Sequence, residues 1–190
     1  MKKRIYQFVF YKIMGWKIVG DNLNIPKKCV MPVVPHTSWH DFYLGIFTRG
    51  ICGLEINFIA KKELFRFPFG YYFRWMGGEP IDRSACLNKV DAIVKVFENH
   101  EEFRLAVAPE GTRKKVLELK SGFYYIAVKA NVPIIPVAFD FGRKTVRIGK
   151  PFYPTLNYEN DLKILLKHFE GVYGKIPELG FSPKDNYSGE

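Results

Sequence analysis

The stretch Cys29-Val-Met-Pro-Val-Val-Pro-His-Thr-Ser-Trp-His-Asp41 decides how this chain folds. Residues 29–34 form a short apolar run that is typical of a buried strand, and Pro35 ends it. Residues 41–47 then have the pattern of a helix start. A buried strand followed by a helix is the repeating unit of α/β domains. The stretch therefore predicts a sheet strand whose end carries polar side chains.

Further strand and helix patterns alternate along the chain. Apolar runs predict strands at 56–60, 105–108, 132–139 and 145–148, and periodic apolar residues predict helices at 87–99, 124–130 and 161–173. This alternation indicates one α/β domain with a mixed, largely parallel central sheet flanked by helices. We assign the domain to residues 21–176 and regard residues 177–190 as a polar tail.

Residues 1–20 have the pattern of a basic amphipathic helix. Apolar residues recur at near-helical spacing, namely Ile5, Phe8, Val9, Ile13, Trp16 and Val19. The basic residues of the segment are Lys2, Lys3, Arg4, Lys12 and Lys17. Such a helix suits a lipid interface, and it equally suits a surface helix packed on the core, because amphipathicity alone does not separate the two. Our prediction for 1–20 is a membrane-associating helix.

Composition and charge narrow the class of protein. The chain has 190 residues, 47% of them hydrophobic, and a formal net charge of +10. A sizeable core can form, and the charge indicates a polyanionic partner, either nucleic acid, anionic lipid or an acidic carrier. We see no secretory signal and no apolar run of the roughly 20 residues that span a bilayer. Three cysteines without CxxC spacing fit a reducing compartment.

Polar residues follow the strand 29–34, where sheets of this class carry their active sites. His36 can take a proton from a hydroxyl, and a carboxylate that fixes its tautomer makes it a better base. Asp41 lies five residues further on. On one continuous helix this spacing separates two side chains, whereas a loop that turns into a helix can bring them together. We predict that His36 is a catalytic base and that Asp41 holds it.

Other interpretations of these residues stay open. Ser38 and Asp41 have the spacing of a capping box, so Asp41 could serve only the helix start. His40 competes as the base, although sequence neighbours such as His40 and Asp41 normally point apart. His36 and His40 have the spacing of a metal pair, but neither an HExxH glutamate nor an obvious third ligand accompanies them. No metal site is predicted.

A second polar stretch, Ala108-Pro109-Glu110-Gly111-Thr112-Arg113, follows the strand that begins at Leu105. Gly111 allows a tight turn, and Arg113 offers a planar guanidinium suited to phosphate. Taken alone, this stretch is better interpreted as a charged turn with a local Glu–Arg pair.

Together the two stretches resemble the first and third sequence blocks of the glycerolipid acyltransferases, a family that includes the 1-acyl-glycerol-3-phosphate acyltransferases. The second block resembles the segment from Lys61 to Arg83, and the fourth resembles Val132-Pro-Ile-Ile-Pro-Val137. Within the second block the matching residues are Lys61-Lys-Glu-Leu-Phe65, Pro68-Phe-Gly70, Gly77 and Pro80-Ile-Asp-Arg83. The blocks occur in order over about residues 30–150.

The resemblance implies transfer of a fatty acyl group from acyl-carrier protein or acyl-coenzyme A to the hydroxyl of a lysophospholipid such as 1-acyl-glycerol-3-phosphate. It implies no bound cofactor, a membrane lipid surface and the acyl donor as partners, and no nucleic acid. It implies a cytoplasmic protein, peripheral on the inner face of the cell membrane. It assigns the acceptor's phosphate to Lys61 (or its neighbour Lys62), Arg83, Glu110, Gly111, Thr112 and Arg113.

The sequence departs from the family pattern around the acceptor rather than at His36 and Asp41. Pro35 stands where the family usually has Asn, Ala108 stands where it often has Phe, and Lys114–Glu118 stands where it often has a Ser/Gly-rich turn. Two alternatives therefore stay open: an O-acyltransferase for an aminolipid or another acceptor without phosphate, and a basic nucleic-acid-binding module.

The aromatic-rich segment 65–76 is predicted to be partly helical. Its rings fit either an apolar tunnel for an acyl chain or the core. The sequence leaves the acyl donor, the chain length, the exact acceptor and the oligomeric state open.

Overall fold

A computed structural model of the chain describes residues 2–20, 25–81 and 88–181. Strand β2 (Lys28–Val34) pairs in parallel with β5 (Phe103–Val107) and with β6 (Val137–Asp140). The strand order is β1-β7-β6-β2-β5, where β1 (Lys17–Gly20) is parallel to β7 (Thr145–Ile148) and β7 is antiparallel to β6. The predicted mixed, largely parallel sheet is confirmed.

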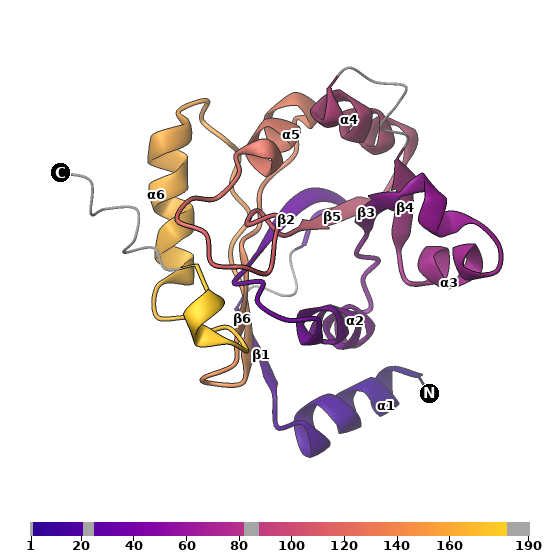
Figure 1. Cartoon of the computed structure of the whole chain (residues 1–190), viewed down its shortest axis with the longest axis vertical. Coiled ribbons are helices and arrows are strands. Elements are labelled where there is room, and N and C mark those ends of the chain that lie inside the picture. The colour runs from indigo at the N-terminus through magenta and orange to yellow at the C-terminus, as the bar shows by residue number, and fades with distance from the viewer. Residues whose placement is uncertain (1, 21–24, 82–87, 182–190) are drawn as a thin grey trace.

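Helices cover both faces of this sheet (Figure 1). One face carries α4 (Lys89–Asn99), α5 (Gly122–Ala130) and α6 (Tyr158–Phe169). The other carries α1 (Lys2–Gln7), its π-helical continuation η1 (Phe8–Ile13) and α2 (His40–Cys52).

Strand β2 is buried on both faces. Val30 and Val34 join the apolar cluster under α4, α5 and α6, whereas Cys29 and Met31 join the cluster under η1 and α2. A strand that must be apolar on both faces reads as a continuous apolar run rather than as an alternating one. This is why residues 29–34 predict the centre of the fold.

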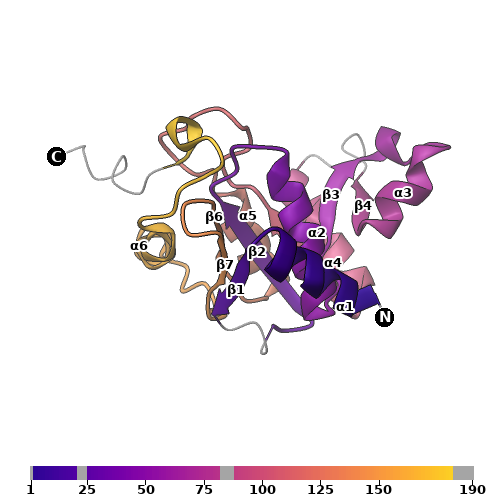
Figure 2. The ribbon, with the colours of Figure 1, turned by 90° about the horizontal axis from the view of Figure 1, so that it is seen from below.

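A smaller unit projects from the end of the molecule opposite α6 (Figure 2). It consists of β3 (Phe58–Lys61) in parallel with β4 (Gly78–Ile81), and of η2 (Lys62–Phe65) and α3 (Phe69–Trp75) between them. A parallel bridge between Asn57 and Leu105 joins β3 to the main sheet. Strand β4 was not expected, because its Gly and Pro residues read as a break.

The N-terminal helix is shorter than the predicted 1–20. It ends at Ile13, and Lys17–Gly20 form strand β1. Gly15 has a φ of +70°, which ends the helix, and Ile18 and Val19 are β-branched residues that favour a strand. No helix in the described part of the chain is long and apolar enough to cross a membrane.

The structure describes residues 177–181 of the predicted polar tail. Residues Pro177–Leu179 form the 3-10 turn η3, and Phe181 is buried in the cluster under α4, α5 and α6. The rest of the predicted tail, 182–190, lies outside the described residues.

Candidate active site

The turn between β2 and α2 brings His36 and Asp41 into contact. Strand β2 ends at Val34, and α2 begins at His40 with Asp41 in its first turn. The Nδ1 atom of His36 lies 3.0 Å from Oδ2 of Asp41. The intervening turn reverses the chain, so two side chains that one helix would hold apart meet across it.

The helix start holds the same oxygen of Asp41 that His36 contacts. The backbone N–H of Ser38 donates to Oδ2 of Asp41 at 3.0 Å, and Asp41 is 3% exposed. The capping interpretation of Asp41 is therefore half right, because this carboxylate receives the Ser38 N–H and also contacts the histidine. A carboxylate near a helix N-terminus is stabilised by the helix dipole.

This contact selects one tautomer of His36. An ionised carboxylate only accepts hydrogen bonds, so Nδ1 of His36 carries the proton that it donates to Asp41. The Nε2 atom is then left with its lone pair. The Nε atom of Arg113 lies 3.5 Å from that Nε2. The histidine side chain is 24% exposed, so a substrate can reach its outer nitrogen.

Glu110 joins the second polar stretch to the first. It is 1% exposed, and its Oε2 accepts the backbone N–H of His36 at 3.0 Å. The two stretches meet because β2 and β5 are neighbouring parallel strands, with Pro32 in register with Val107. Parallel strands carry their C-terminal ends at the same edge of a sheet.

Burial perturbs the Glu110 carboxyl. Loss of water raises its pKa to about 7, although the His36 N–H works in the opposite direction. Its second oxygen, Oε1, is buried without a hydrogen-bond partner. Glu110 is therefore a buried titratable group in direct contact with the backbone of the candidate base.

The remaining residues of the second stretch form an exposed turn. Gly111 has a φ of +66°, and Thr112 Oγ1 accepts the backbone N–H of Lys114 at 3.2 Å. A Cβ built on Gly111 would lie 2.5 Å from Nζ of Lys120. Lys120 is thus a second cation at this turn, beside the predicted Arg113. Lys120 is nine residues from Gly111 in the sequence, so local spacing does not indicate that the two meet. The backbone N–H of Lys120 donates to the carbonyl oxygen of Pro109 and closes the turn.

Lys61 and Arg83 are the other cations predicted to bind phosphate, and Lys61 does not lie beside Arg113 and Lys120. Lys61 is exposed at the end of β3, in the smaller unit. Among the described residues, the cations that line the cavity beside His36 are Arg49 and Arg113, and Lys61 does not line it. Arg83 lies outside the described residues.

An apolar cavity of about 480 Å³ opens beside His36. It lies between α2, β3 and β5, and His36, Asp41 and Arg113 contribute to its wall. Its apolar lining includes Val33, Phe42, Ile46, Ile56, Phe58 and Met76. An apolar cavity with a few convergent polar groups is the usual form of a small-molecule site.

His40 faces a different cavity. Its Nδ1 lies 2.8 Å from Oγ of Ser38, and its ring lies 4.1 Å from that of Trp39. It lines a separate hollow of about 860 Å³, which shares only Trp39 and Tyr43 with the cavity beside His36. His40 therefore does not compete for Asp41. Nowhere in residues 2–20, 25–81 and 88–181 do three His, Cys, Asp or Glu residues gather as a metal site would require.

Residues 18–140 match the family model described as Acyltransferase. This match spans both polar stretches of the site. The chain is 32% identical to a 1-acyl-sn-glycerol-3-phosphate acyltransferase of Saccharomyces cerevisiae, over 90% of this chain and 62% of that protein. It is also 32% identical to the chloroplastic 1-acyl-sn-glycerol-3-phosphate acyltransferase BAT2 of Brassica napus, over 92% of this chain and 48% of that protein. The chain thus spans about half to three fifths of these relatives.

The fold is similar to a solved structure. The crystal structure of the 1-acyl-sn-glycerophosphate (LPA) acyltransferase PlsC from Thermotoga maritima superposes with a TM-score of 0.56 at 25% sequence identity. The match covers 87% of this chain and 73% of that one.

Proposed function

The chain belongs to the acyltransferase family, and from this premise we propose that it transfers a fatty acyl group from acyl-carrier protein or acyl-coenzyme A to the hydroxyl of a lysophospholipid such as 1-acyl-glycerol-3-phosphate. One observation carries the proposal: the 3.0 Å contact between His36 and Asp41 at the wall of an apolar cavity. The names of the relatives support an acceptor that carries a phosphate.

The reaction follows from the tautomer of His36. Nε2 removes the proton of the acceptor hydroxyl while the hydroxyl oxygen attacks the thioester carbonyl carbon. The new C–O ester bond forms, the C–S bond breaks, and the imidazolium returns its proton to the leaving thiolate. Asp41 stabilises the imidazolium between these steps. The acyl donor is a co-substrate, and the step uses no resident cofactor.

Arg113 is the proposed centre of phosphate binding. Its guanidinium lies beside Nε2 of His36, so a phosphate held there leaves the hydroxyl of the same small molecule within reach of the base. Gly111 and Thr112 shape the turn that carries Arg113, and Glu110 anchors it. Lys120 is our addition to this set. Lys61 and Arg83 stay in it on the strength of the family resemblance alone.

Substitution of each histidine tests the base. We expect His36→Ala to lower kcat/KM for acyl transfer by about 10²–10⁴-fold, the usual loss when a general base is removed. His40→Ala is the matched control, because its ring faces the other cavity. Thiol release from the acyl donor measures the rate, and circular dichroism checks folding. Near-wild-type turnover of His36→Ala, with a loss in His40→Ala, would show that the base is His40.

A panel of acceptors within the same assay tests the substrate class. Lysophosphatidic acid, other lysophospholipids and an acceptor without phosphate are offered with one acyl donor, to the wild type and to Arg113→Ala. We expect Arg113→Ala to lose activity only with phosphorylated acceptors. Equal loss with every acceptor would show that Arg113 does not recognise phosphate, and faster acylation of the acceptor without phosphate by the wild type would favour the acyltransferase without a phosphate acceptor. Salt-sensitive DNA binding without thiol release would favour the nucleic-acid module.

A further inference from the structure

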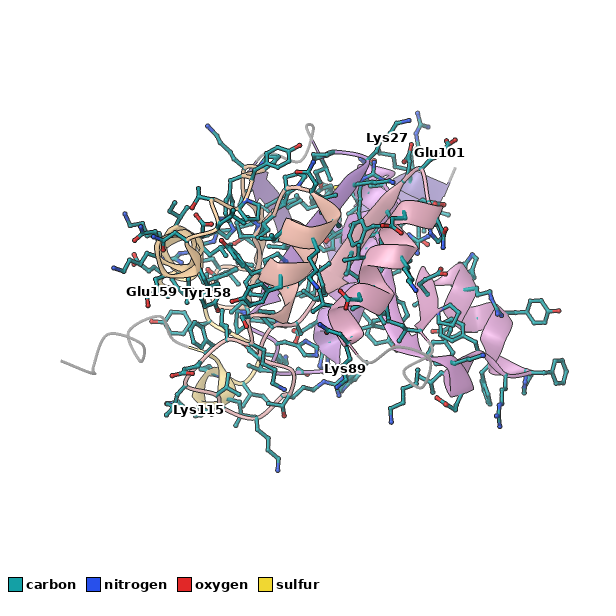
Figure 3. The ribbon with its side chains drawn as sticks, turned by 90° about the horizontal axis from the view of Figure 1, so that it is seen from above. Lys27, Lys89, Glu101, Lys115, Tyr158 and Glu159 are labelled. Atoms are coloured by element: carbon teal, nitrogen blue, oxygen red, sulfur yellow. The ribbon has the colours of Figure 1, made fainter. Side chains whose placement is uncertain are left out.

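The unit formed by η2 and α3 exposes an aromatic surface. Phe67, Phe69, Tyr71 and Trp75 are 87%, 65%, 78% and 64% exposed. Figure 3 shows α3 and its side chains projecting away from the body of the molecule. Aromatic side chains bury the largest apolar areas in cores and interfaces, so four exposed rings on one small unit indicate a surface that meets a partner.

The inner side of the same unit is well packed. Phe65 and Met76 are buried, and the rings of Phe65 and Phe73 lie 6.0 Å apart. A Cβ built on Gly70 would lie 2.0 Å from the carbonyl oxygen of Phe65, so α3 lies directly on the backbone of η2. The exposed rings are therefore the outer face of a folded unit rather than core residues that lack a core.

Cations accompany the rings. Arg66 and Arg74 are exposed on the unit, and the guanidinium carbon of Arg74 lies 5.4 Å from the centroid of the Phe65 ring. Lys62 begins η2, and Glu63 is the one acidic residue between Lys61 and Gly78. Tyr and Trp gather at the headgroup level of bilayers, and Arg and Lys near that level attract anionic lipids. The composition fits a lipid surface better than a second protein.

The unit also borders a cavity that adjoins the candidate active site. Met76, directly after α3, lines both the 480 Å³ cavity beside His36 and a neighbouring cavity of about 270 Å³. Ile46 and Arg49 of α2 line both as well.

The smaller cavity lies between α1 and α3, because Tyr6 and Trp75 contribute to its wall. Ile5 of α1 and Phe8, the first residue of η1, are 59% and 60% exposed. Segments with exposed apolar side chains therefore flank the smaller cavity, which shares the wall residues Ile46, Arg49 and Met76 with the cavity beside His36.

We propose that the aromatic face of the α3 unit inserts into the headgroup region of an anionic phospholipid bilayer, and that the lipid acceptor enters the site between α1 and α3. This inference rests on the proposed function, because a lipid acceptor is what requires an entrance that faces the bilayer. The exposed aromatic residues of the segment 65–76 would then contact lipid at the surface, instead of filling the core or lining a tunnel for the acyl chain.

A vesicle-binding experiment on the full chain tests the proposal. The variant Phe67→Ser/Phe69→Ser/Tyr71→Ser is compared with the wild type by flotation with vesicles of phosphatidylglycerol and phosphatidylcholine. We expect its partition coefficient to fall by roughly tenfold or more, since three inserted rings are lost. The matched control is Tyr153→Ser/Ile164→Ser, whose side chains are 63% and 56% exposed. The start of α6, marked by Tyr158 and Glu159 in Figure 3, lies on the side opposite α3.

A single substitution at Trp75 tests insertion into the bilayer independently of the triple variant. Brominated phospholipids in the vesicles quench a tryptophan that enters the bilayer. Trp39 is 53% exposed, so both proteins in the comparison carry Trp39→Phe, and we expect Trp75→Phe in this background to remove most of the quenching. Trp16 is buried, with 5% of its surface exposed, so its fluorescence should not be quenched by the brominated lipid. Unchanged partition of the triple variant, or unchanged quenching in Trp75→Phe, would overturn the proposal. So would dimers that the triple variant abolishes while vesicle binding persists.

The outcome for α3 is separable from that for the proposed function. Acylation of a short-chain acceptor dissolved as monomers needs no bilayer, and we expect the triple variant to retain it within about twofold. Vesicle binding through α3 in a protein that acylates no acceptor would refute the proposed function and leave the membrane surface standing.

Discussion

The Glu110 carboxyl shows how one buried group joins two parts of the chain. It stands 74 positions after His36 in the sequence and accepts the backbone N–H of that residue at 3.0 Å. A hydrogen bond to a buried charged acceptor is worth more than one between neutral groups. The same burial raises the pKa of Glu110 from 4.5 to about 7, so its protonation changes near neutral pH.

Glu110 should make stability depend on pH. Its pKa is higher in the folded than in the unfolded chain, so the folded state binds the extra proton between pH 4.5 and about 7. This contribution is complete below pH 4.5 and is lost as the pH rises through about 7. We expect the unfolding free energy of the wild type, relative to Glu110→Gln, to fall between pH 5 and pH 8 by on the order of 3 kcal/mol.

Urea unfolding at intervals of one pH unit measures this difference. Glu118→Gln, at an exposed position of the same loop, controls for the loss of one charge. If the profiles of the wild type and Glu110→Gln run parallel, Glu110 does not titrate in this window.

Among the elements, α1 and α2 depend on one close approach. A Cβ built on Gly50 of α2 would lie 2.5 Å from Cδ2 and 2.7 Å from Cε2 of the Tyr6 ring. The Tyr6 ring also lies edge-on to that of Phe47, at 5.7 Å. Gly50 is therefore the position where α1 docks, whereas Gly45 on the same helix has no neighbouring atom within 4 Å of such a Cβ.

Alanine at these two glycines should have opposite effects. We expect Gly50→Ala to push α1 off α2 and to destabilise the fold by about 1–3 kcal/mol, the usual cost of overpacking. Gly45→Ala should stabilise α2 by about 0.5–1 kcal/mol, because alanine suits a helix interior better than glycine. Hydrogen exchange of the α1 amides and urea unfolding measure the two effects. Unchanged α1 protection in Gly50→Ala would contradict this account of the docking.

The helical elements also show where local patterns mislead. Apolar residues of 1–20 keep a near-helical spacing through Val19, yet Val19 pairs with Arg147 of β7 in a sheet. The pairing partner lies more than 120 residues away, so no window of sequence contains it. The aromatic residues of 65–76 were likewise assigned to core or tunnel, although five of them are at least half exposed, namely Phe67, Phe69, Tyr71, Tyr72 and Trp75.

For the whole molecule, the N-terminal segment combines two roles that the sequence left as alternatives. Phe10 and Trp16 are 0% and 5% exposed and belong to the core under α2. Ile5, Phe8 and Ile13 are 59%, 60% and 67% exposed on the outside. Removal of residues 1–20 would take out β1 and part of the core, so it cannot test membrane binding by itself.

Point substitutions on the outer face avoid that damage. We expect Ile5→Gln/Phe8→Gln/Ile13→Gln to bind anionic vesicles at least roughly tenfold more weakly, because each CH₂ that no longer enters the bilayer loses about 0.8 kcal/mol, and two such groups already exceed the roughly 1.4 kcal/mol of a tenfold change. The Tm should stay unchanged, since these side chains are exposed. Vesicle flotation and thermal unfolding give the two readouts. Wild-type partitioning of this variant would mean that α1 only packs on the core.

The sequence by itself determined the class of fold, the family, and the pairing of His36 with Asp41 as a hypothesis. These depend on contacts within a short window: an apolar strand, a turn and a helix start, repeated in order along the chain. The order of strands agrees with the predicted mixed sheet, while β1 and β4 escaped prediction because short strands with glycine or proline are defined by their partners.

Only the tertiary structure decided which polar groups meet. It joined Glu110 and Arg113 to His36 through neighbouring parallel strands, turned His40 toward a different cavity, and left Lys61 on the smaller unit. It also decided which aromatic residues are exposed. The physical reason is that burial and long-range contact are properties of the packed chain, since both depend on residues that are far apart in sequence and close in space.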